Sequence, residues 1–416
     1  MKTKQESLGV AFNRLWAASL ASNIADGLFK TAVPLLAAVL TRDPVLIAAL
    51  GAVVMLPWLL FAIPIGTIVD RVDRRRAMAV ANLVRLTGGA LLTASVIGGW
   101  VSIWLLYIVA FVIGAAEVLY DTTSQAIIPN LLKPELLERG NSKLEIGGMI
   151  LGEMIGTPLS GLLFAVAVFV PFLGGNFGIA AATLMVLMIP HFAKPKETAV
   201  LEPKVSMFAD MKFGIKYLYE NKTLLKLVLF TTAVGFWFTS TGSTQVLFLL
   251  DVLHVPEAAF GFVFLAGAVG SIVGGILAPK MSKRFGRMNI MSLAILSSGV
   301  FIFLCGFTPN VFVWAILQLL GGIAMTFWNV LLMSTYHQII PNELFGRIHG
   351  TRRTLVWGMM PLGAMVGGLI AKIDLRAPML IGGAISALIA LFGIPFIRRL
   401  DALVTLQSPT EQPTQE

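Results

Sequence analysis

Twelve long apolar segments run along the chain, and they restrict what it can fold into more than any other feature. Each has about 20 residues or more, enough to cross about 30 Å of hydrocarbon as an α-helix. Only 13% of the 416 residues are charged and 57% are hydrophobic, whereas soluble domains carry about a quarter charged residues. We number the segments as spans one to twelve: 13–39, 45–69, 77–98, 101–127, 143–168, 170–191, 223–250, 256–279, 287–307, 311–337, 350–371 and 377–397.

Each span is predicted to be helical, because backbone groups in lipid have no water to bond and must bond one another. The short segments of alternating hydrophobicity that form a β-barrel are not found. The sequence therefore predicts an all-α membrane protein with twelve transmembrane helices.

Basic residues distinguish the two sides of the membrane. Nearly all Lys and Arg residues lie in the two tails and the even-numbered loops, whereas the odd-numbered loops hold only Arg42, Lys372 and Arg376. By the positive-inside rule, both termini are predicted to be cytoplasmic, in a multi-pass protein of the inner (cytoplasmic) membrane. The net charge of +9 then reflects orientation and contact with anionic membrane lipid, and requires no nucleic-acid partner.

Neither an active site nor a metal or cofactor site is expected. The single cysteine, Cys305, lies inside span nine, and the four histidines at positions 191, 254, 337 and 349 are far apart in the sequence. The chain has no glycine-rich nucleotide loop and no Ser/His/Asp set. We therefore predict a protein that is not an enzyme and that has no cofactor and no metal.

Two charged loops show that the chain contains an internal repeat. The stretch GTIVDRVDRRRAM (66–78) after span two recurs as GILAPKMSKRFGR (275–287) after span eight, and an IIPN tetrapeptide occurs at 127–130 and again at 339–342. Two six-helix repeats related in this way are one plan of secondary transporters, with the substrate site near the midplane.

The repeat sets the predicted domains. Residues 1–191 form an N-terminal six-helix bundle and residues 223–400 a C-terminal one. Residues 192–222 form a cytoplasmic linker, in which Phe208, Met211, Ile215, Leu218 and Tyr219 lie at helical spacing opposite lysines; this pattern predicts an amphipathic helix on the inner leaflet. The polar, proline-containing tail at 401–416 is predicted to be disordered.

The twelve spans, the repeat and the G-x-x-x-D-R-x-x-R-R loop resemble the major facilitator superfamily over residues 10–400. The loop departs from the usual motif at Asp73, where glycine is normal. That substitution and the segments IIPNLLKPELLERGN and FGIKYLYENKTLLKLVLF resemble the branch of siderophore exporters and macrolide-efflux proteins.

The resemblance implies that the charged loop is a cytoplasmic latch that favours the inward-closed state. Its residues are Gly66, Asp70, Arg71, Arg74 and Arg75. Gly66 allows two helices to approach closely, and Asp70 can bond free N–H groups at a helix end. The alternative is that the arginines only set the topology.

Six ionisable residues lie inside first-half spans, away from the ends of the spans: Asp26, Lys30, Arg85, Glu117, Asp121 and Glu153. Such residues are costly in a membrane and usually functional. Asp26 and Lys30 are four residues apart and can neutralise each other, and by helical rise Arg85 and Asp121 lie at depths where they can pair.

Glu117 and Glu153 have no obvious partner and lie near the midplane. A carboxyl group taken out of water binds a proton more readily. Glu117, Glu153, Asp26, Asp121 and Arg85 are therefore the candidates for proton coupling or cation binding. The alternative for the two glutamates is a buried acid that stays protonated.

Span five contains GEMIGTPLSG (152–161). Gly152 and Gly156 form a small-x-x-x-small pattern that favours close helix packing, and Pro158 removes a donor from the helical hydrogen bonds. The segment loosely resembles a Gly-Pro motif of proton-coupled exporters, with Thr157 inserted between the two residues.

The second half offers aromatic and uncharged polar groups for a substrate cavity: Phe236, Trp237, Thr239, Gln245, Trp328 and Asn329. A cavity that is acidic on one side and aromatic on the other suits a bulky amphiphile. The alternative is that these side chains pack helices or face lipid.

Together these features favour a proton-coupled exporter of amphiphilic small molecules (drug, macrolide or siderophore type), an antiporter that works by alternating access as a monomer. The first alternative is a lipid or lysophospholipid flippase of the same fold. An alternative of another class is a membrane sensor or scaffold without transport activity.

Overall fold

The computed structural model describes residues 7–69, 71–190 and 207–407. These residues form helices and turns, with no strand among them. Twelve helical segments of the described chain are long and apolar enough to cross a membrane, as the sequence predicts. Most predicted bounds agree with the observed helices within a few residues, but spans five and eleven begin earlier and spans eight and twelve end later.

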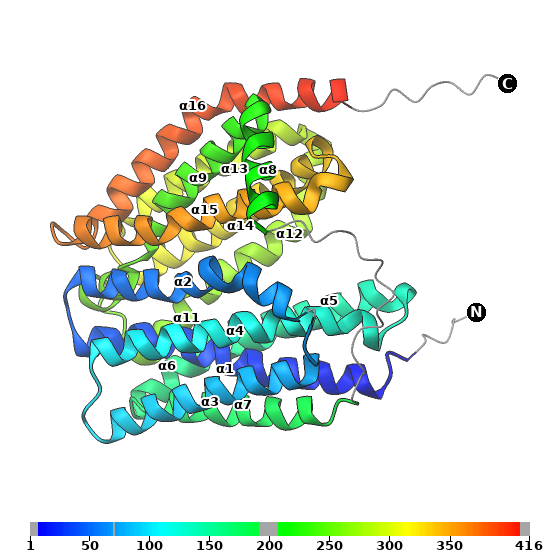
Figure 1. Ribbon diagram of the computed structural model, residues 1–416. Coiled ribbons are helices and arrows are strands. Elements are labelled where there is room, and N and C mark those ends of the chain that lie inside the picture. Colours follow the sequence, from blue (N-terminus) through cyan, green and yellow to red (C-terminus); the bar gives the residue numbers. More distant parts are fainter. Residues whose placement is uncertain (1–6, 70, 191–206, 408–416) are drawn as a thin grey trace, which may run out of the picture. The chain divides into compact units, whose positions relative to one another are not determined.

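The first half of the chain forms spans one to six (Figure 1). Its helices are α1 (Val10–Leu40), α2 (Pro44–Val69), α3 (Arg74–Ile97), α4 (Ile103–Leu131), η1 (Pro134–Leu136), α5 (Leu137–Gly148), η2 (Met149–Gly156), α6 (Thr157–Val166) and α7 (Val170–Leu187).

The rest of the chain forms spans seven to twelve, preceded by one helix of the linker. Its helices are α8 (Met207–Glu220), α9 (Lys222–Gly242), α10 (Gln245–Leu247), η3 (Phe248–Val252), α11 (Glu257–Val263), α12 (Leu265–Phe285), α13 (Arg287–Cys305), α14 (Val311–Ile339), α15 (Asn342–Ala371) and α16 (Ala377–Gln407). The tail predicted to be disordered from residue 401 is helical as far as Gln407, and residues 408–416 lie outside the described chain.

Span five differs from the single helix predicted for 143–168. It consists of α5, the π-helix η2 and α6. The hydroxyl of Thr157 donates to the Gly152 carbonyl at 3.2 Å, and the Thr157 backbone N–H bonds the same carbonyl, five residues back. Pro158 follows directly and has no N–H to donate, so the wider π turn lies where the α-helical bonding is interrupted.

The described chain divides into two compact units, which do not coincide with the two repeats. Unit 1 comprises Met1–Lys204 and Leu249–Leu265, and unit 2 comprises Val205–Phe248 and Ala266–Glu416. The segment 249–265 belongs to the second repeat by sequence, yet it packs within unit 1. Arg42 forms an ion pair with Asp251 at 3.1 Å, and α11 packs on α6.

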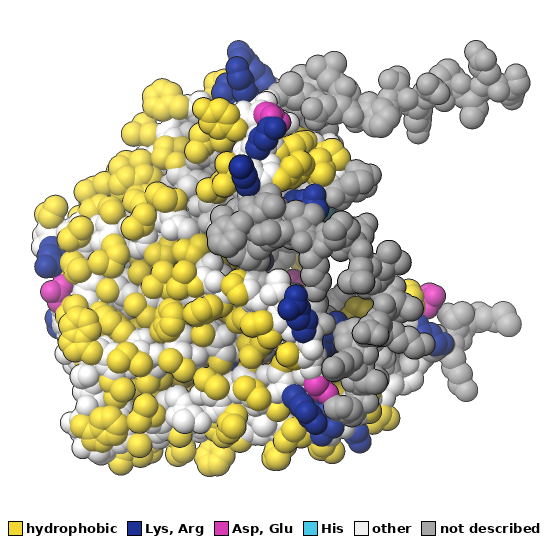
Figure 2. Space-filling view, viewed as in Figure 1, with side chains coloured by type: hydrophobic (Ala, Val, Ile, Leu, Met, Phe, Trp, Pro, Cys, Tyr) yellow, Lys and Arg dark blue, Asp and Glu magenta, His cyan; other side chains and the backbone are white. Residues whose placement is uncertain are grey.

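In unit 1, α1 packs against α7, and α3 packs against both α4 and α7 (Figure 1). One buried cluster joins α1, α3 and α4, and includes Phe12, Leu15, Met78 and Tyr120. Many large apolar side chains remain exposed on the outer surfaces of the helices. Figure 2 shows hydrophobic side chains over most of the face in view and Lys and Arg mainly near the helix ends, the pattern expected of lipid-facing helices.

In unit 2, α13 packs against α16 and α9 against α15. The linker helix α8 packs on α15, with the Gly214 backbone against Thr351 and Leu218 buried in the core. Ile215 and Tyr219 of the predicted apolar face are exposed. The side chains of Phe208 and Met211, and all of residues 191–206, lie outside the described chain.

Candidate functional site: charged residues inside unit 1

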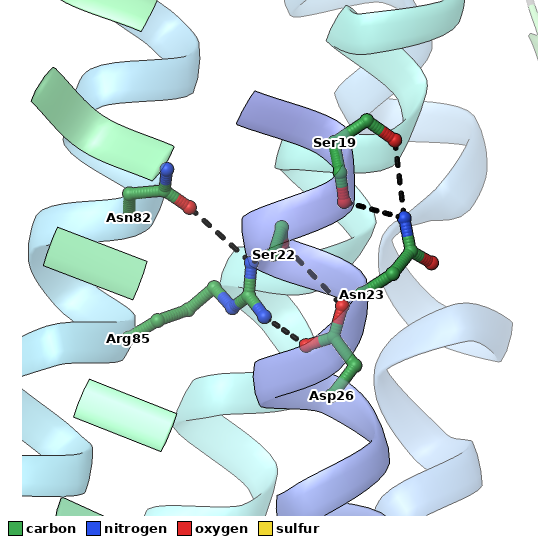
Figure 3. Close-up of polar contacts among 6 residues, drawn as sticks. All are labelled: Ser19, Ser22, Asn23, Asp26, Asn82 and Arg85. Carbon is green, nitrogen blue, oxygen red and sulfur yellow. Dashed lines mark hydrogen bonds and ion pairs between the residues drawn. The ribbon is translucent and has the colours of Figure 1, made fainter. Parts of the chain in front are cut away.

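Asp26 of α1 and Arg85 of α3 form an ion pair in the interior of unit 1 (Figure 3). Asp26 lies about 24 Å from the start of α1, near its middle, by the helical rise of 1.5 Å per residue. The Arg85 side chain is 1% exposed, whereas that of Asp26 is 31% exposed. Asp26 is therefore the accessible member of the pair.

Neighbouring polar groups satisfy much of the buried guanidinium of Arg85. Its Nη1 donates to Ser22 Oγ at 2.9 Å and to Asn82 Oδ1 at 3.2 Å, and Ser22 donates to Asp26 at 3.4 Å. The guanidinium also lies over the Tyr120 ring, 5.6 Å from its centroid. A buried charge is tolerated only when it is paired and hydrogen-bonded to this degree. The network is therefore an integral part of the folded structure of unit 1.

Two predicted pairings are therefore wrong. Arg85 pairs with Asp26 and not with Asp121, and Asp26 does not pair with Lys30. Helical rise predicts the depth of each residue but not the direction in which its side chain points. Ser22 and Asp26 lie one turn apart on α1, and the Arg85 guanidinium reaches both of them from α3.

Lys30 pairs instead with Glu153, with 2.5 Å between Nζ and Oε1. The prediction that Glu153 has no obvious partner is therefore also wrong. Glu153 lies in the π-helix η2, which packs against α1. The Lys30 and Glu153 side chains are 61% and 45% exposed. This pair is therefore accessible to solvent, whereas the Asp26–Arg85 pair is largely buried.

The contact between α1 and η2 depends on glycine. A Cβ at Gly27 would meet the Gly152 carbonyl and lie 2.9 Å from Gly156 Cα. A Cβ at Gly156 would lie 2.9 Å from the Ile24 carbonyl. These backbones touch as the small-x-x-x-small pattern of Gly152 and Gly156 predicts, and this contact holds Glu153 beside Lys30.

Glu117 and Asp121 lie one turn apart on α4, and both are half-buried. Among the described residues, neither carboxylate makes a hydrogen bond or an ion pair. Glu117 lies within electrostatic range of Asp26, Lys30, Arg85 and Asp121. Unit 1 thus brings together the six ionisable residues that the sequence places away from the span ends.

The latch loop is only partly described, because Asp70 lies outside the described residues. Arg71 is exposed, and Arg74 begins α3 with its side chain half-buried. A Cβ at Gly66 would have no described atom within 4 Å, so the close helix approach expected there is not found. The latch itself stays a prediction.

Arg75 and Asp73 have contacts within unit 1. Arg75 donates to the Leu187 carbonyl at the C-terminal end of α7, where Arg14 also donates to the Met188 carbonyl at 2.5 Å. Two arginines at a helix C-terminus bond free carbonyls, and their positive charges interact favourably with the negative end of the helix dipole. Asp73 caps α3, accepting the Arg76 N–H at 2.9 Å, which gives a local reason for aspartate at this motif position.

The second-half candidates are divided between surface and core of unit 2. Phe236 and Trp237 are half-buried and make an edge-to-face contact, with 5.4 Å between ring centroids. Gln245 is half-buried and Asn329 is exposed. These four remain available to a ligand.

Trp328 and Thr239 are placed differently. Trp328 is 3% exposed and packs in the core of unit 2 against Phe230, 5.7 Å between centroids. The Thr239 hydroxyl is buried and donates to the Gly235 carbonyl at 2.9 Å. Neither side chain is presented to a cavity in this structure, so we leave both out of the proposed site.

A family model described as "Transmembrane secretion effector", within the major facilitator superfamily, matches residues 8–412. The chain belongs to this family. It is a multi-pass membrane transporter and not an enzyme.

Relatives of this major facilitator protein include two exporters by name. Macrolide efflux protein A of Streptococcus pyogenes is 22% identical over 410 residues, which cover 96% of this chain and 99% of the relative. The enterobactin exporter EntS of Escherichia coli O81 is 24% identical over 368 residues, covering 86% of this chain and 85% of the relative.

Solved structures share the major facilitator fold. The nucleoside transporter NupG has a TM-score of 0.76 at 15% identity, and the match covers 94% of this chain and 100% of the transporter. A bacterial homologue of the lysosomal transporter Spinster, solved in an inward-facing state, has a TM-score of 0.71 at 14% identity, covering 99% and 100%. At these identities the likeness concerns the fold alone.

Two polar residues of this transporter's site, Ser22 and Asn82, were missed by sequence reasoning, and Lys30 was not expected to pair with Glu153. A signal for them existed. Ser22, Asp26 and Lys30 are spaced by four residues and share one face of α1, and Asn82 precedes Arg85 by three residues, the spacing of neighbours on a helix.

Proposed function

We propose that this chain is a proton-coupled exporter that exchanges amphiphilic small molecules for protons by alternating access. One observation carries the proposal: carboxyl groups outnumber basic groups in the interior of unit 1. Asp26 is matched by Arg85 and Glu153 by Lys30. Glu117 and Asp121 remain without an ion-pair partner among the described residues.

Two carboxylates without partners at membrane depth are unfavourable when ionised, because a charge removed from water loses its solvation. They become neutral by binding a proton, or compensated by binding a cation. A site with these two choices can exchange one for the other, and such exchange is what an antiporter requires.

The exposure of the second ion pair supports a water-filled pathway. Lys30 and Glu153 are open side chains in the middle of membrane spans. Charged side chains at this depth normally face the protein interior or water and rarely face lipid. We therefore propose a pathway along the face of α1 and η2 that carries this pair. In unit 2, we propose Phe236, Trp237, Gln245 and Asn329 as groups that bind substrate.

The names of the relatives support export of small amphiphiles, since one is a macrolide efflux protein and another an enterobactin exporter. We further propose that the protein resides in the cytoplasmic membrane as a monomer. The placement of Lys and Arg predicts that both termini lie inside the cell. Labelling of single cysteines introduced at the two ends of α1, from each side of intact cells, tests this orientation.

Transport into proteoliposomes under an imposed pH gradient tests the function. We expect gradient-dependent movement of a macrolide or a catecholate siderophore that a protonophore abolishes. Glu117→Gln should abolish driven accumulation but retain substrate counterflow, whereas Glu220→Gln, at an exposed acid of α8, should have no effect.

Other results would contradict the proposal. Equal transport with and without a gradient would rule out proton coupling. Movement of a fluorescent lysophospholipid alone would indicate a flippase, and binding without transport of any probe would indicate a sensor.

A further inference from the structure

The linker helix α8 packs on α15 where span eleven enters the membrane. That span, Leu344–Ala371, has 28 residues, or about 42 Å by helical rise, so about 6 Å at each end extends beyond a hydrocarbon core of about 30 Å. The Arg347 guanidinium lies over the Phe213 ring of α8, 5.8 Å from its centroid, and the Gly214 backbone lies against Thr351. These contacts lie about 5 and 10 Å from the start of the span, on either side of the boundary between headgroups and hydrocarbon.

The helix α8 runs across α15 and not along it (Figure 1), so it lies along the membrane surface with one face on unit 2. Leu218 is buried in the core of unit 2, whereas Ile215 and Tyr219 are 46% and 76% exposed. Lys212 and Lys216 are exposed as well. Residues four apart share one side of a helix, so the two lysines form one row beside the row of Ile215 and Tyr219.

The two segments that form this surface carry a net positive charge. Residues 207–222 and 342–353 contain six Lys or Arg and three Asp or Glu residues. Figure 2 shows basic side chains beside hydrophobic ones over α8. Lys216 pairs with Glu220 at 3.7 Å, but the two side chains are 74% and 65% exposed. Such exposed pairs are weak, so the ammonium of Lys216 remains able to bind another anion.

We propose that the exposed side of α8 and the first turns of α15 bind anionic phospholipid of the inner leaflet. Lys212 and Lys216 contact the lipid phosphates, and Arg347 adds positive charge at the same level. Ile215 and Tyr219 enter the boundary between headgroups and acyl chains, as the apolar side chains of interfacial helices do. Tyrosine is favoured at this depth. Each basic residue near an anionic leaflet increases membrane affinity about fivefold.

Lipid bound to α8 would also hold the start of span seven. Asn221 joins the two helices: its backbone N–H donates to the Tyr217 carbonyl at 2.9 Å, and its side chain caps α9 by accepting the Leu224 N–H at 3.0 Å. The inference goes beyond the proposed function, because it concerns the lipid and not the transported substrate. It rests on the proposed orientation, which places α8 on the cytoplasmic side.

The test measures amide hydrogen exchange of residues 207–220 by mass spectrometry, with the full chain in lipid nanodiscs. One set of nanodiscs contains phosphatidylcholine alone, and the other contains phosphatidylcholine mixed with anionic phosphatidylglycerol. We expect exchange in α8 of the wild-type protein to be at least about fivefold slower in the anionic nanodiscs. Added salt screens exposed charges, so this slowing should decrease as the ionic strength is raised.

Replacing both lysines of α8, Lys212→Gln with Lys216→Gln, should abolish most of the difference between the two lipids. The variant with Lys212→Arg and Lys216→Arg keeps the charges and should keep the difference. The matched control is Lys280→Gln with Lys283→Gln, which removes two exposed lysines from α12 of the same unit. This control lowers the net charge equally and should leave the slowing in α8 unchanged.

Equal exchange of wild-type α8 in the two lipids would overturn the proposal, and so would slowing that is independent of salt or that persists in the glutamine variant. Glycerol 3-phosphate added to phosphatidylcholine nanodiscs should have no effect; if it slowed exchange equally, the surface would be a site for soluble anions and not for the membrane. Gradient-driven transport in phosphatidylcholine proteoliposomes would still support the proposed function, so the two failures can be told apart.

Discussion

Replacing Asp26 by asparagine should destabilise the protein strongly, because it leaves the guanidinium of Arg85 buried without its counter-ion. The Arg85 side chain is 1% exposed, so water cannot replace the lost carboxylate. Breaking a buried ion pair by removing one partner typically costs about 3–5 kcal/mol. Ser22 and Asn82 still bond Nη1 but carry no charge.

The measurement is thermal unfolding of detergent-solubilised protein, followed by the helical signal in circular dichroism. A loss of about 3–5 kcal/mol should lower the midpoint by on the order of 5 °C or more in a chain of this size. The double variant Asp26→Leu with Arg85→Met removes both charges together. It should recover most of the loss, since apolar replacements of a buried pair are often neutral or stabilising.

The matched control breaks the other ion pair of α1. Lys30→Met removes a side chain that is 61% exposed, so we expect a change of about 1 kcal/mol or less. Equal destabilisation by Asp26→Asn and Lys30→Met, or a double variant as unstable as Asp26→Asn alone, would show that the buried pair is not coupled as the structure indicates.

Three further predictions concern single side chains. Glu117→Gln should reduce gradient-driven uptake at least tenfold, with counterflow retained; equal losses in both assays would mean a general defect. Gly261→Leu should lower the unfolding midpoint, because a Cβ there lies 2.7 Å from Pro158 Cα and overpacking costs about 1–3 kcal/mol; Gly321→Leu, where a Cβ meets open space, is the control. Asp73→Ala should cost about 1 kcal/mol through loss of the α3 cap, and Asp73→Ser should not, as thermal unfolding can check.

The fold was largely predictable because the constraint of the membrane acts on local sequence. Each run of apolar residues must bond its own backbone and therefore forms a helix. Span five departs from this rule only at Pro158, where the missing N–H is itself visible in the sequence. The assignment of 249–265 to unit 1 was not predictable, because it depends on the packing of Gly261 against Thr157 and Pro158.

The residues that form the site were predictable from the sequence, but the ion pairs among them were not. The cost of burying charge selects Asp26, Lys30, Arg85, Glu117, Asp121 and Glu153 from the sequence alone. Which of them meet depends on the rotation of each helix about its axis. Trp328 shows the same limit, since an aromatic residue beside an exposed Asn329 faces the core of unit 2.

The two ion pairs of α1 lie one helical turn apart and differ in exposure. The buried Asp26–Arg85 pair is a permanent structural contact, whereas the exposed Lys30–Glu153 pair can open and re-form. Opening a pair that contributes about 3–5 kcal/mol is rare, whereas a pair worth about 1 kcal/mol or less opens continually. We therefore expect Asp26 and Arg85 to stay joined throughout transport and to link α1 to α3. If so, Asp26 is not available to an entering cation, and exchange is left to Glu153 and to Glu117 and Asp121 of α4, which make no ion pair among the described residues.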